Sequence, residues 1–588
     1  MSFPNLLKKA PFIQPFKKIL KPVYDCTWRR YENSYGNWIR TQESPFVSQL
    51  TSNIDTNIPT KLTLFTPILR LDEIEKLSQT IESVRNQTQK VPCWIIATPD
   101  AFSADVTAIV GIELQDNIIV VPYKKTEEIN TLLFASEASY IGFLEPGDRL
   151  TRLASQVVNQ SIAEQPDISV FYTDEDHLKP NGKRTDPWLK PEFNIYNLRS
   201  ANYLRHFLIV KKNLGDEIGW FGYNSDAKVP WYDFALRLAD AEPKIYHIPQ
   251  VLYHNQALRP AAISENTLWE PEVQDRLALQ SHLARRKVKT EVLPNNYIDS
   301  FRVRYIPRNE SLVSILIPNC NQTNLLKRCV DSIREKTDWE NYEILIVENN
   351  SDEDSIFEYY QSLQKDLDFP GKVLYWPDEF NYSAINNWAA EQAQGDIFVF
   401  LNNDTEVISP DWLQEMIGLA QQPDVGAVGA KLLFPDKTIQ HVGIGLGKIS
   451  DQFFFHIAEW MPAELPGYYG WTRKTNAVIA VTGACLMIER VKFMAVGGFD
   501  PALPMSFNDV ELCLNLYSKG NINLGIPQAK LIHHESKTRG QTITKEQRKT
   551  NKAYFNFLKK KWPATFQNFD PFFSPALRFD HFYKDRIK

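Results

Sequence analysis

The sequence predicts an α/β fold made of two tandem domains, each built on a mainly parallel, Rossmann-like sheet. Both halves of the chain open with a short apolar run that ends in proline, at 62–67 and at 313–318. Each run leads into a helical pattern and then into a second apolar run. This strand–helix–strand order requires a right-handed crossover, which makes the two strands parallel.

The elements of this opening keep the same order in both halves. The helical patterns lie around 72–85 and 323–335, and the second strands lie around 94–96 and 344–347. Apolar residues recur every three or four positions in the former and run together in the latter. These periods are typical of half-exposed helices and of buried strands.

A longer internal repeat supports the tandem arrangement. Segment 140–148 resembles 397–405, and segment 233–238 resembles 511–516. In each half, the second of these segments is followed by Ile-Pro-Gln and then by histidine. Because the same landmarks recur in the same order, we interpret the halves as two copies of one fold.

The chain of 588 residues is too long for one ordinary domain and comfortable for two. We expect five segments: a basic and aromatic N-terminal extension (1–57), a degenerate first domain (58–295), a linker (296–310), a catalytic second domain (311–540) and a helical and extended C-terminal appendage (541–588).

Composition and charge exclude several classes of protein. A hydrophobic fraction of 43% with a net charge of -6 fits a globular protein and argues against a nucleic-acid binder. The 6 cysteines form no CxxC pair, which favours reduced thiols in a cytosolic protein. Apolar runs are too short for a membrane span, and lysines interrupt the apolar residues of any signal peptide.

The leading segment 3–22 mixes bulky apolar residues with lysines. One interpretation is a segment that lies on an anionic membrane surface and gives peripheral contact. The other is a mobile tail, because its prolines interrupt any long helix.

A cluster of oxygen ligands follows the apolar run 398–401. Asn402, Asn403 and Asp404 supply two amide carbonyls and one carboxylate. A buried strand delivers such groups to the carboxyl edge of a sheet, where Mg²⁺ or Mn²⁺ can neutralise a diphosphate leaving group. The alternative is an Asn/Asp-rich turn, which is common after strands.

Glu348 ends the second strand of this half, just before Asn349, Asn350 and Ser351. An acid at a strand end can accept hydrogen bonds from a ribose or a base. The neighbouring Asn350 or Ser351 can cap the following helix instead, and the two roles are compatible.

Asp509 stands just before an amphipathic pattern at 512–516. A carboxylate there can take the proton of an attacking hydroxyl, or it can be a helix-start acid that the macrodipole stabilises. Its occurrence together with Asp404 favours the catalytic role. His533 and His534 follow a further apolar run, and either is a candidate metal ligand or a structural histidine.

Many ordered motifs carry a family resemblance through the second half, namely 313–318, 347–351, 381–387, 400–407, 425–432, 481–486, 497–500, 508–511 and 533–536. On these motifs, residues 311–540 resemble the family 2 glycosyltransferases with a GT-A fold, in the branch that builds bacterial surface polysaccharides. The resemblance implies an inverting transfer from a nucleotide-diphosphate sugar to a growing glycan, carried by a lipid at the inner membrane face. It therefore implies a cytoplasmic enzyme.

The resemblance also assigns site residues. Asp404 matches the metal-binding end of the Asp-x-Asp motif, and Asn402 stands where the motif has its first Asp. Asp509 matches the base, and His533 or His534 matches the late metal histidine. The implied donor-binding residues, with Glu348 where Asp is more usual, are Pro318, Glu348, Asn350, Asn386, Asn403 and Gly483. The implied cofactor is Mg²⁺ or Mn²⁺.

The first half, about 58–260, resembles the same family more faintly, and its catalytic positions differ. The repeat sets Gly147 against Asp404, Trp231 against Asp509, and Ala97 or Thr98 against Glu348. A glycine offers no ligand atom and an indole accepts no hydroxyl proton. We therefore expect a silent first domain that binds glycan or braces the second, although Glu145, Asp148, Asp174 and Asp176 remain.

Three alternatives remain beside a transferase with one working site. In a bifunctional enzyme both halves would transfer sugar. A non-catalytic glycan-binding scaffold would not need both Asp404 and Asp509. A sugar-nucleotide pyrophosphorylase would need a glycine-rich phosphate loop after its first strand, and 318–323 contains no glycine.

Overall fold

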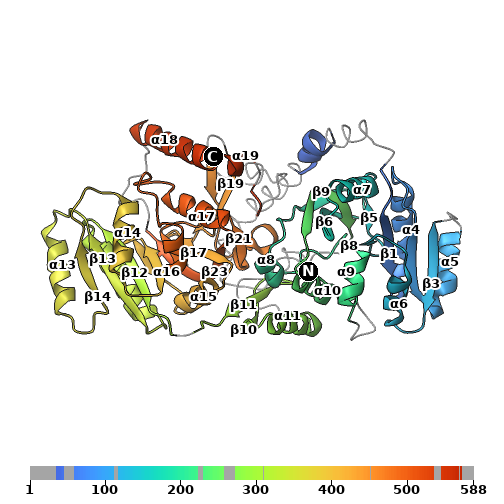
Figure 1. Cartoon of the computed structure of the whole chain (residues 1–588), viewed down its shortest axis with the longest axis horizontal. Helices are drawn as coiled ribbons and strands as arrows, with labels where there is room; N and C mark the ends of the chain where they lie inside the picture. The colour runs from blue at the N-terminus through green and yellow to red at the C-terminus, as the bar shows by residue number, and fades with distance from the viewer. Residues whose placement is uncertain are drawn as a thin grey trace, which may run out of the picture. The chain divides into compact units, whose positions relative to one another are not determined.

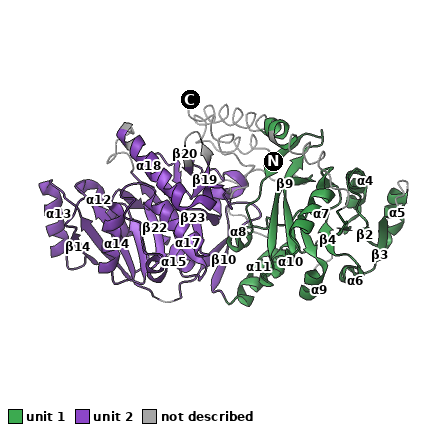
Figure 2. Ribbon diagram, turned by 45° about the horizontal axis from the view of Figure 1, so that its top comes forward, with its two compact units in different colours: residues 1–262, 271–287, 573–588 green, residues 263–270, 288–572 purple. Residues whose placement is uncertain are grey.

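Two compact units make up the computed structural model of the chain (Figure 2). The structure describes residues 35–44, 58–111, 117–222, 229–256, 272–308, 310–449, 452–534, 545–567 and 570–572. Of these, the residues up to 287 belong to unit 1, and the residues from 288 to 572 belong to unit 2. Leading segment 3–22, for which membrane contact was considered, lies outside the described residues.

Unit 1 contains a sheet with one continuous path of paired strands. Their order is β3 (Ile118–Tyr123), β2 (Trp94–Pro99), β1 (Leu62–Pro67), β4 (Tyr140–Phe143), β8 (Ile209–Lys211), β6 (Val170–Leu178), β9 (Ile245–Asn255) and β5 (Arg149–Leu150), with β7 (Arg184–Trp188) beside β6. Figure 1 shows β3 at one end of this unit and β6 and β9 towards the other.

Unit 2 repeats that path with strands later in the chain. Their order is β14 (Gly371–Tyr375), β13 (Tyr342–Glu348), β12 (Val313–Asn319), β15 (Ile397–Leu401), β22 (Cys485–Glu489), β17 (Val425–Leu433), β23 (Ile522–His533) and β16 (Thr405–Val407); β18 (Ile439–His441) pairs with β17 and β21 (Asn476–Val478) with β23. The internal repeat of the sequence is thus a repeat of topology.

Parallel pairing dominates the first half of each path. Strands β14, β13, β12 and β15 are mutually parallel, as are β3, β2, β1 and β4. The later strands mix directions: β22 is antiparallel to β15 and β17, whereas β17 and β23 are parallel. The predicted α/β class with two tandem, mainly parallel sheets is confirmed.

The helices lie between these strands in the chain. Unit 1 has η2 (Ile39–Glu43), α4 (Leu71–Arg85), η3 (Asp100–Phe102), α5 (Ser103–Gly111), α6 (Glu128–Ala135), α7 (Ala154–Glu164), α8 (Ile195–Ser200), α9 (Lys212–Ile218), α10 (Trp231–Asp240) and α11 (Val273–Arg285). Unit 2 has α12 (Thr323–Lys336), α13 (Asp354–Lys365), α14 (Tyr382–Gln392), α15 (Trp412–Ala420), η4 (Tyr468–Arg473), α16 (Arg490–Ala495), α17 (Asn508–Ser518), α18 (Lys545–Lys561) and α19 (Pro563–Gln567).

The central strands are buried on both faces. Every residue of β15 is buried, and so is every residue of β12 except Pro318. Continuous apolar runs are what such a position requires, because both faces of a parallel sheet are covered. The helical patterns expected around 72–85 and 323–335 correspond to α4 and α12.

The segment expected to link the domains, 296–310, contains a strand. Strand β11 (Phe301–Tyr305) pairs antiparallel with β10 (Thr290–Pro294), and both belong to unit 2. Arg302 and Arg304 hold the hairpin against α15, through Glu415 at 2.6 and 2.5 Å. A further hairpin, β19 (Ile444–Ile449) with β20 (Gln452–His456), also belongs to this unit.

A search of the described residues for a helix that is long and apolar enough to cross a membrane finds none.

The close approach of α15 to β11 predicts the effect of one substitution. A Cβ atom at Gly418 would lie 1.8 Å from the carbonyl oxygen of Tyr305. We expect Gly418→Ala to lower the free energy of unfolding by about 1–3 kcal/mol, because backbone cannot move aside as a side chain can. Thermal and denaturant unfolding of the full chain measure this. Gly111→Ala, at a helical glycine with open space around it, is the matched control and should leave stability unchanged or slightly higher. Equal effects of both substitutions would contradict the packing of α15 against β11.

Candidate active site

The candidate site lies at the carboxyl edge of three parallel strands of unit 2. Strand β12 pairs with both β13 and β15, and its last residue, Asn319, lies opposite Glu348. Asn402, Asn403 and Asp404 follow directly after β15. Because parallel strands end at a common edge, groups separated by tens of residues in sequence come together here.

Asp404 faces a histidine from the far strand β23. The Nε2 atom of His533 lies 3.0 Å from Oδ1 of Asp404, and both side chains are buried. Strand β16, which begins at Thr405, pairs with β23 so that Thr405 lies opposite His533. The pairing of β16 with β23 therefore places Asp404, the residue before β16, beside His533.

The other ring nitrogen of His533 has its own partner. Nδ1 lies 2.7 Å from Oε1 of Gln440, a buried side chain of β18. With the amide in this orientation the oxygen only accepts, so Nδ1 carries the proton. Nε2 faces Oδ1 of Asp404, and the amide nitrogen Nδ2 of Asn402 lies 3.3 Å from the same ring nitrogen.

This donor set fits a divalent metal ion. The Asp404 carboxylate and the His533 imidazole, whose second nitrogen is hydrogen-bonded, meet at 3.0 Å. The Asn402 amide turns its nitrogen Nδ2 to the ring at 3.3 Å, so Asn402 could hold an ion only through its carbonyl oxygen. A hydrogen-bonded second nitrogen fixes the ring orientation in most metal-binding histidines. The imidazole suits Mn²⁺ better than Mg²⁺, which prefers oxygen ligands and water.

His534 points its ring to a different group. Its Nε2 lies 3.2 Å from Oε2 of Glu406 and 3.4 Å from Arg328, while its backbone nitrogen donates to the carbonyl of Asp404. Burial works against ionisation of Glu406, but hydrogen bonds from His534 and Lys336 outweigh it and lower the pKa of that carboxyl. Of the two candidate histidines, the structure thus brings the ring of His533 to Asp404.

Asp509 lies in the first turn of α17, where its carboxylate is fixed by backbone donors. The backbone nitrogen of Gly483 donates to Oδ2 at 2.9 Å, and that of Val510 donates to Oδ1 at 2.8 Å. The Tyr382 hydroxyl donates to the carbonyl of Gly483 at 3.0 Å. The loop before β22 therefore sets the position of this carboxylate.

The same loop contacts the metal-side cluster. The backbone nitrogen of Asn402 donates to the carbonyl of Ala484 at 3.1 Å, one residue from the nitrogen that holds Asp509. The candidate metal ligands and the candidate base are thus attached to successive residues of one loop.

A second hydrogen-bonded chain reaches Glu348. The amide of Asn403 donates to Asn319 at 2.6 Å, Asn319 donates to the Tyr360 hydroxyl at 2.8 Å, and Tyr360 donates to Glu348 at 2.6 Å. Ser351 gives Glu348 two further hydrogen bonds, from its nitrogen at 2.6 Å and from its hydroxyl at 2.7 Å. Burial raises the pKa of Tyr360, and Glu348 raises it further.

The remaining expected donor-binding residues lie in different surroundings. Pro318 is partly exposed at the end of β12, and Asn350 is exposed, with φ of 58° and its amide on the carbonyl of Asp378. Asn386 is fully buried in α14, and its amide nitrogen donates to Tyr382 of the same helix. The structure does not bring Asn386 to the surface of the site.

The sequence analysis did not identify several residues that organise the site: Asn319, Tyr360, Gln440 and Lys561. Asn319 directly follows the proline that closes the apolar run 313–318 and is the last residue of β12, so its position was a usable signal. Tyr360 and Gln440 act from elements whose pairing the sequence does not specify.

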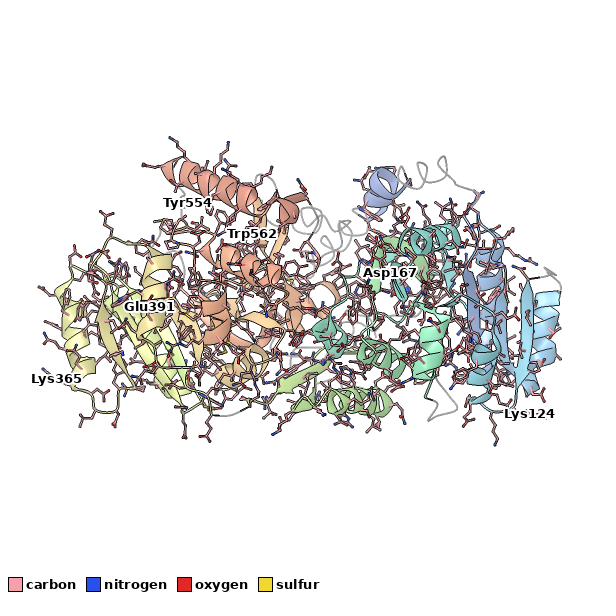
Figure 3. All side chains as sticks on the ribbon, in the orientation of Figure 1. Lys124, Asp167, Lys365, Glu391, Tyr554 and Trp562 are labelled. Carbon is pink, nitrogen blue, oxygen red and sulfur yellow. The ribbon has the colours of Figure 1, made fainter. Side chains whose placement is uncertain are left out.

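Lys561, at the end of α18, docks the C-terminal segment beside the candidate base. Its Nζ lies 2.7 Å from Glu511 and 2.6 Å from Asp500. Burial raises the pKa of the Glu511 carboxyl, although Lys561 acts in the opposite direction. Figure 3 labels Tyr554 and Trp562 on this segment. The backbone nitrogen of Trp562 donates to the carbonyl of the buried Leu558.

Unit 1 has other residues at the matching places. The equivalent prolines of the two units, Pro67 and Pro318, lie opposite Ala97 and Val347. Thr98 and Glu348 each follow the residue opposite the proline, so Thr98 corresponds to Glu348. Trp231 begins α10 and is buried, with its ring 5.2 Å from Phe143 and from Phe221. The indole belongs to the core of unit 1.

Comparison with known proteins identifies the family of unit 2. Residues 314–473 match the family described as Glycosyl transferase family 2. The match contains Glu348 and the Asn402–Asp404 cluster. Unit 2 carries a family 2 glycosyltransferase domain.

Curated relatives extend the similarity beyond the glycosyltransferase domain. The chain is 38% identical over 409 residues to the O-antigen biosynthesis protein RfbC of Myxococcus xanthus, covering 69% of this chain and 31% of that protein. It is 35% identical over 517 residues to the uncharacterized protein y4gI of Sinorhizobium fredii, covering 85% and 56%. An N-acetylglucosaminyl-diphospho-decaprenol L-rhamnosyltransferase of Mycobacterium tuberculosis is 30% identical over 97 residues, covering 16% and 28%. The chain therefore spans about a third to about half of the length of the first two relatives.

The geometry predicts different effects for the two neighbouring histidines. We expect His533→Ala to weaken Mn²⁺ binding in unit 2 by at least tenfold, and His534→Ala to leave it unchanged. Gln440→Leu should also weaken Mn²⁺ binding, by about 10–100-fold, because the ring loses the group that orients it. Titration with Mn²⁺, followed by the electron paramagnetic resonance signal of the free ion, measures these affinities. A larger loss in His534→Ala than in His533→Ala would contradict the assignment.

Proposed function

We propose that this chain is an inverting, metal-dependent glycosyltransferase that moves a sugar from a nucleotide-diphosphate donor to a growing glycan. The observation that carries the proposal is the connected edge of unit 2. Asp404 with His533, the nucleotide-side acid Glu348 and the candidate base Asp509 belong to one hydrogen-bonded framework. These are the parts that a one-step displacement needs.

On the donor side, Asp404, His533 and Asn402 would hold Mn²⁺ or Mg²⁺, which when bound neutralises the charge of the departing diphosphate. Glu348 is fixed by Ser351 and Tyr360, so its carboxylate is oriented before a nucleotide arrives. Asn403 is fixed on Asn319 in the same way. A framework that is ordered in advance loses little entropy when the donor binds.

On the acceptor side, Asp509 would take the proton from the attacking hydroxyl. Its two oxygens accept hydrogen bonds from backbone N–H groups at 2.9 and 2.8 Å, which hold the carboxylate in place. A carboxylate fixed in this way at the start of α17 could receive the proton of an attacking hydroxyl.

We propose a glycan on a lipid diphosphate carrier as the acceptor, met at the inner face of the membrane. The support is the similarity to two relatives, one named for O-antigen biosynthesis and one named for a diphospho-decaprenol acceptor. The sugar, the nucleotide base and the linkage depend on loop shape that these residues do not specify.

Unit 1 is proposed to transfer no sugar. Trp231 occupies the place of the base and is packed in the core, and Thr98 occupies the place of Glu348. Gly147 lies where the repeat has Asp404. Transfer at this unit would therefore lack the group that accepts the hydroxyl proton, which argues against the bifunctional alternative.

The proposal predicts the loss of activity in one isosteric variant. The full chain is incubated with UDP-, GDP- and dTDP-sugars, with and without Mn²⁺ or Mg²⁺, and released nucleotide is measured. We expect metal-dependent release with one donor class, and Asp509→Asn should reduce it by about 10²–10⁴-fold, because proton transfer contributes that much.

The matched control is Asp233→Asn, a first-turn carboxylate of α10 in unit 1. Release should persist in this variant. Release that survives Asp509→Asn would move the chemistry away from unit 2. Metal-independent release in the wild-type chain would contradict the role given to Asp404 and His533.

A further inference from the structure

Unit 1 contains a cluster of metal-ligating side chains at its own sheet edge. Glu145 and Asp148 follow β4, and His206 precedes β8, the antiparallel neighbour of β4. One ligand atom from each of the three residues lies within 4.8 Å of the others. Among the described residues, this is the group of three such side chains that converge so closely.

The histidine of this cluster is oriented for ligation. Its Nδ1 lies 2.9 Å from both oxygens of Glu175, a fully buried residue that also pairs with the buried Lys190 at 2.9 Å. Since Lys190 already balances the charge of Glu175, a neutral imidazole that donates from Nδ1 satisfies this contact. Nε2 then keeps its lone pair, as in metal sites where a carboxylate orients the histidine.

Asp148 is a buried carboxylate without a matching cation in its hydrogen bonds. It is 6% exposed, and within the described part of the chain it accepts from the Tyr253 hydroxyl at 2.6 Å and from the Gln256 nitrogen at 2.9 Å. Both donors are neutral. A buried carboxylate whose hydrogen bonds come from neutral donors is a favourable ligand for a cation, because removing its charge from water is costly.

The other carboxylate of the cluster, Glu145, forms a long ion pair with Arg205. Arg205 lies 3.3 and 3.4 Å from the two oxygens of Glu145, and its side chain is 49% exposed. An exposed arginine with long contacts can turn into solvent at little cost. Two carboxylates and an imidazole would then face one space.

This donor set is not the one used in unit 2. There the histidine comes from β23, next to the edge strand β16. In unit 1 the histidine comes from the loop before β8, which occupies the place of β22 in the strand order. Glu145 corresponds in the repeat to Asn402, whereas Asp148 and His206 come from positions that hold no candidate ligand in unit 2.

We propose that unit 1 binds a divalent transition-metal ion, Mn²⁺ or Zn²⁺, through Glu145, Asp148 and His206. Two carboxylates with one imidazole favour these ions over Ca²⁺, which takes oxygen ligands. Three protein ligands leave coordination positions for water or for an anionic group. In unit 1 Trp231 stands at the place of Asp509, and the first-turn carboxylate Asp233 is paired with Arg237 at 2.8 Å, so the ion would serve binding rather than sugar transfer.

The test is a Mn²⁺ titration of the full chain, with and without His533→Ala. In the His533→Ala chain we expect one remaining Mn²⁺ site. Asp148→Asn and His206→Gln should each weaken this site by at least tenfold in that background. Asp167→Asn, at a carboxylate whose side chain is 82% exposed in the same unit, is the matched control and should leave the site unchanged. Saturating Mn²⁺ should raise the melting temperature of the His533→Ala chain but not that of either double variant.

Two results would overturn the proposal. One is the absence of Mn²⁺ and Zn²⁺ binding in the His533→Ala chain up to millimolar concentration. The other is a site that persists in both Asp148→Asn and His206→Gln. The decisive comparison is Mn²⁺ binding with and without the unit 1 substitutions in the His533→Ala background. Its outcome does not depend on how His533→Ala itself affects binding, so failure here is distinguishable from failure of the proposed site in unit 2.

Discussion

The carboxyl edge of the parallel strands β13, β12 and β15 is the constraint on which the candidate active site depends. These strands are held in one register by backbone hydrogen bonds, with Asn319 opposite Glu348. Glu348, Asn319 and the Asn402–Asp404 cluster must therefore emerge side by side. The side chains then bond to one another, and Tyr360 and Asn319 convert a shared edge into a fixed arrangement.

Two further elements complete this edge, and both come from the part of the sheet in which strand directions are mixed. The loop before β22 holds Asp509 and Asn402 through successive residues, and β23 supplies His533. Family 2 membership rests on 314–473, which includes the metal-side carboxylate but ends before Asp509 and His533. The geometry links those two residues to the matched region.

The two units show how one fold diverges while its strand order is kept. In unit 1 the place of the base holds Trp231, which fills the core beside Phe143 and Phe221. Unit 1 has a buried network of charged side chains along β6. In it Glu175 contacts Lys190 and His206, and Asp176 contacts Arg184. His206, through its contact with Glu175, joins the cluster of Glu145, Asp148 and His206 to this network.

The sequence by itself determined the α/β class and the tandem repeat, and it singled out the carboxylates Asp404 and Asp509 as candidates, because periodicity and strand-end position are local properties. It left His533 and His534 equivalent, since the two are adjacent at the end of β23, which includes His533 but not His534. It also expected a linker where β11 pairs with β10, because the ion pairs of Arg302 and Arg304 with Glu415 join residues far apart in the chain. Only the tertiary structure decided these points and the roles of Gln440 and Tyr360. Strand pairing sets which side chains meet, and no local pattern encodes it.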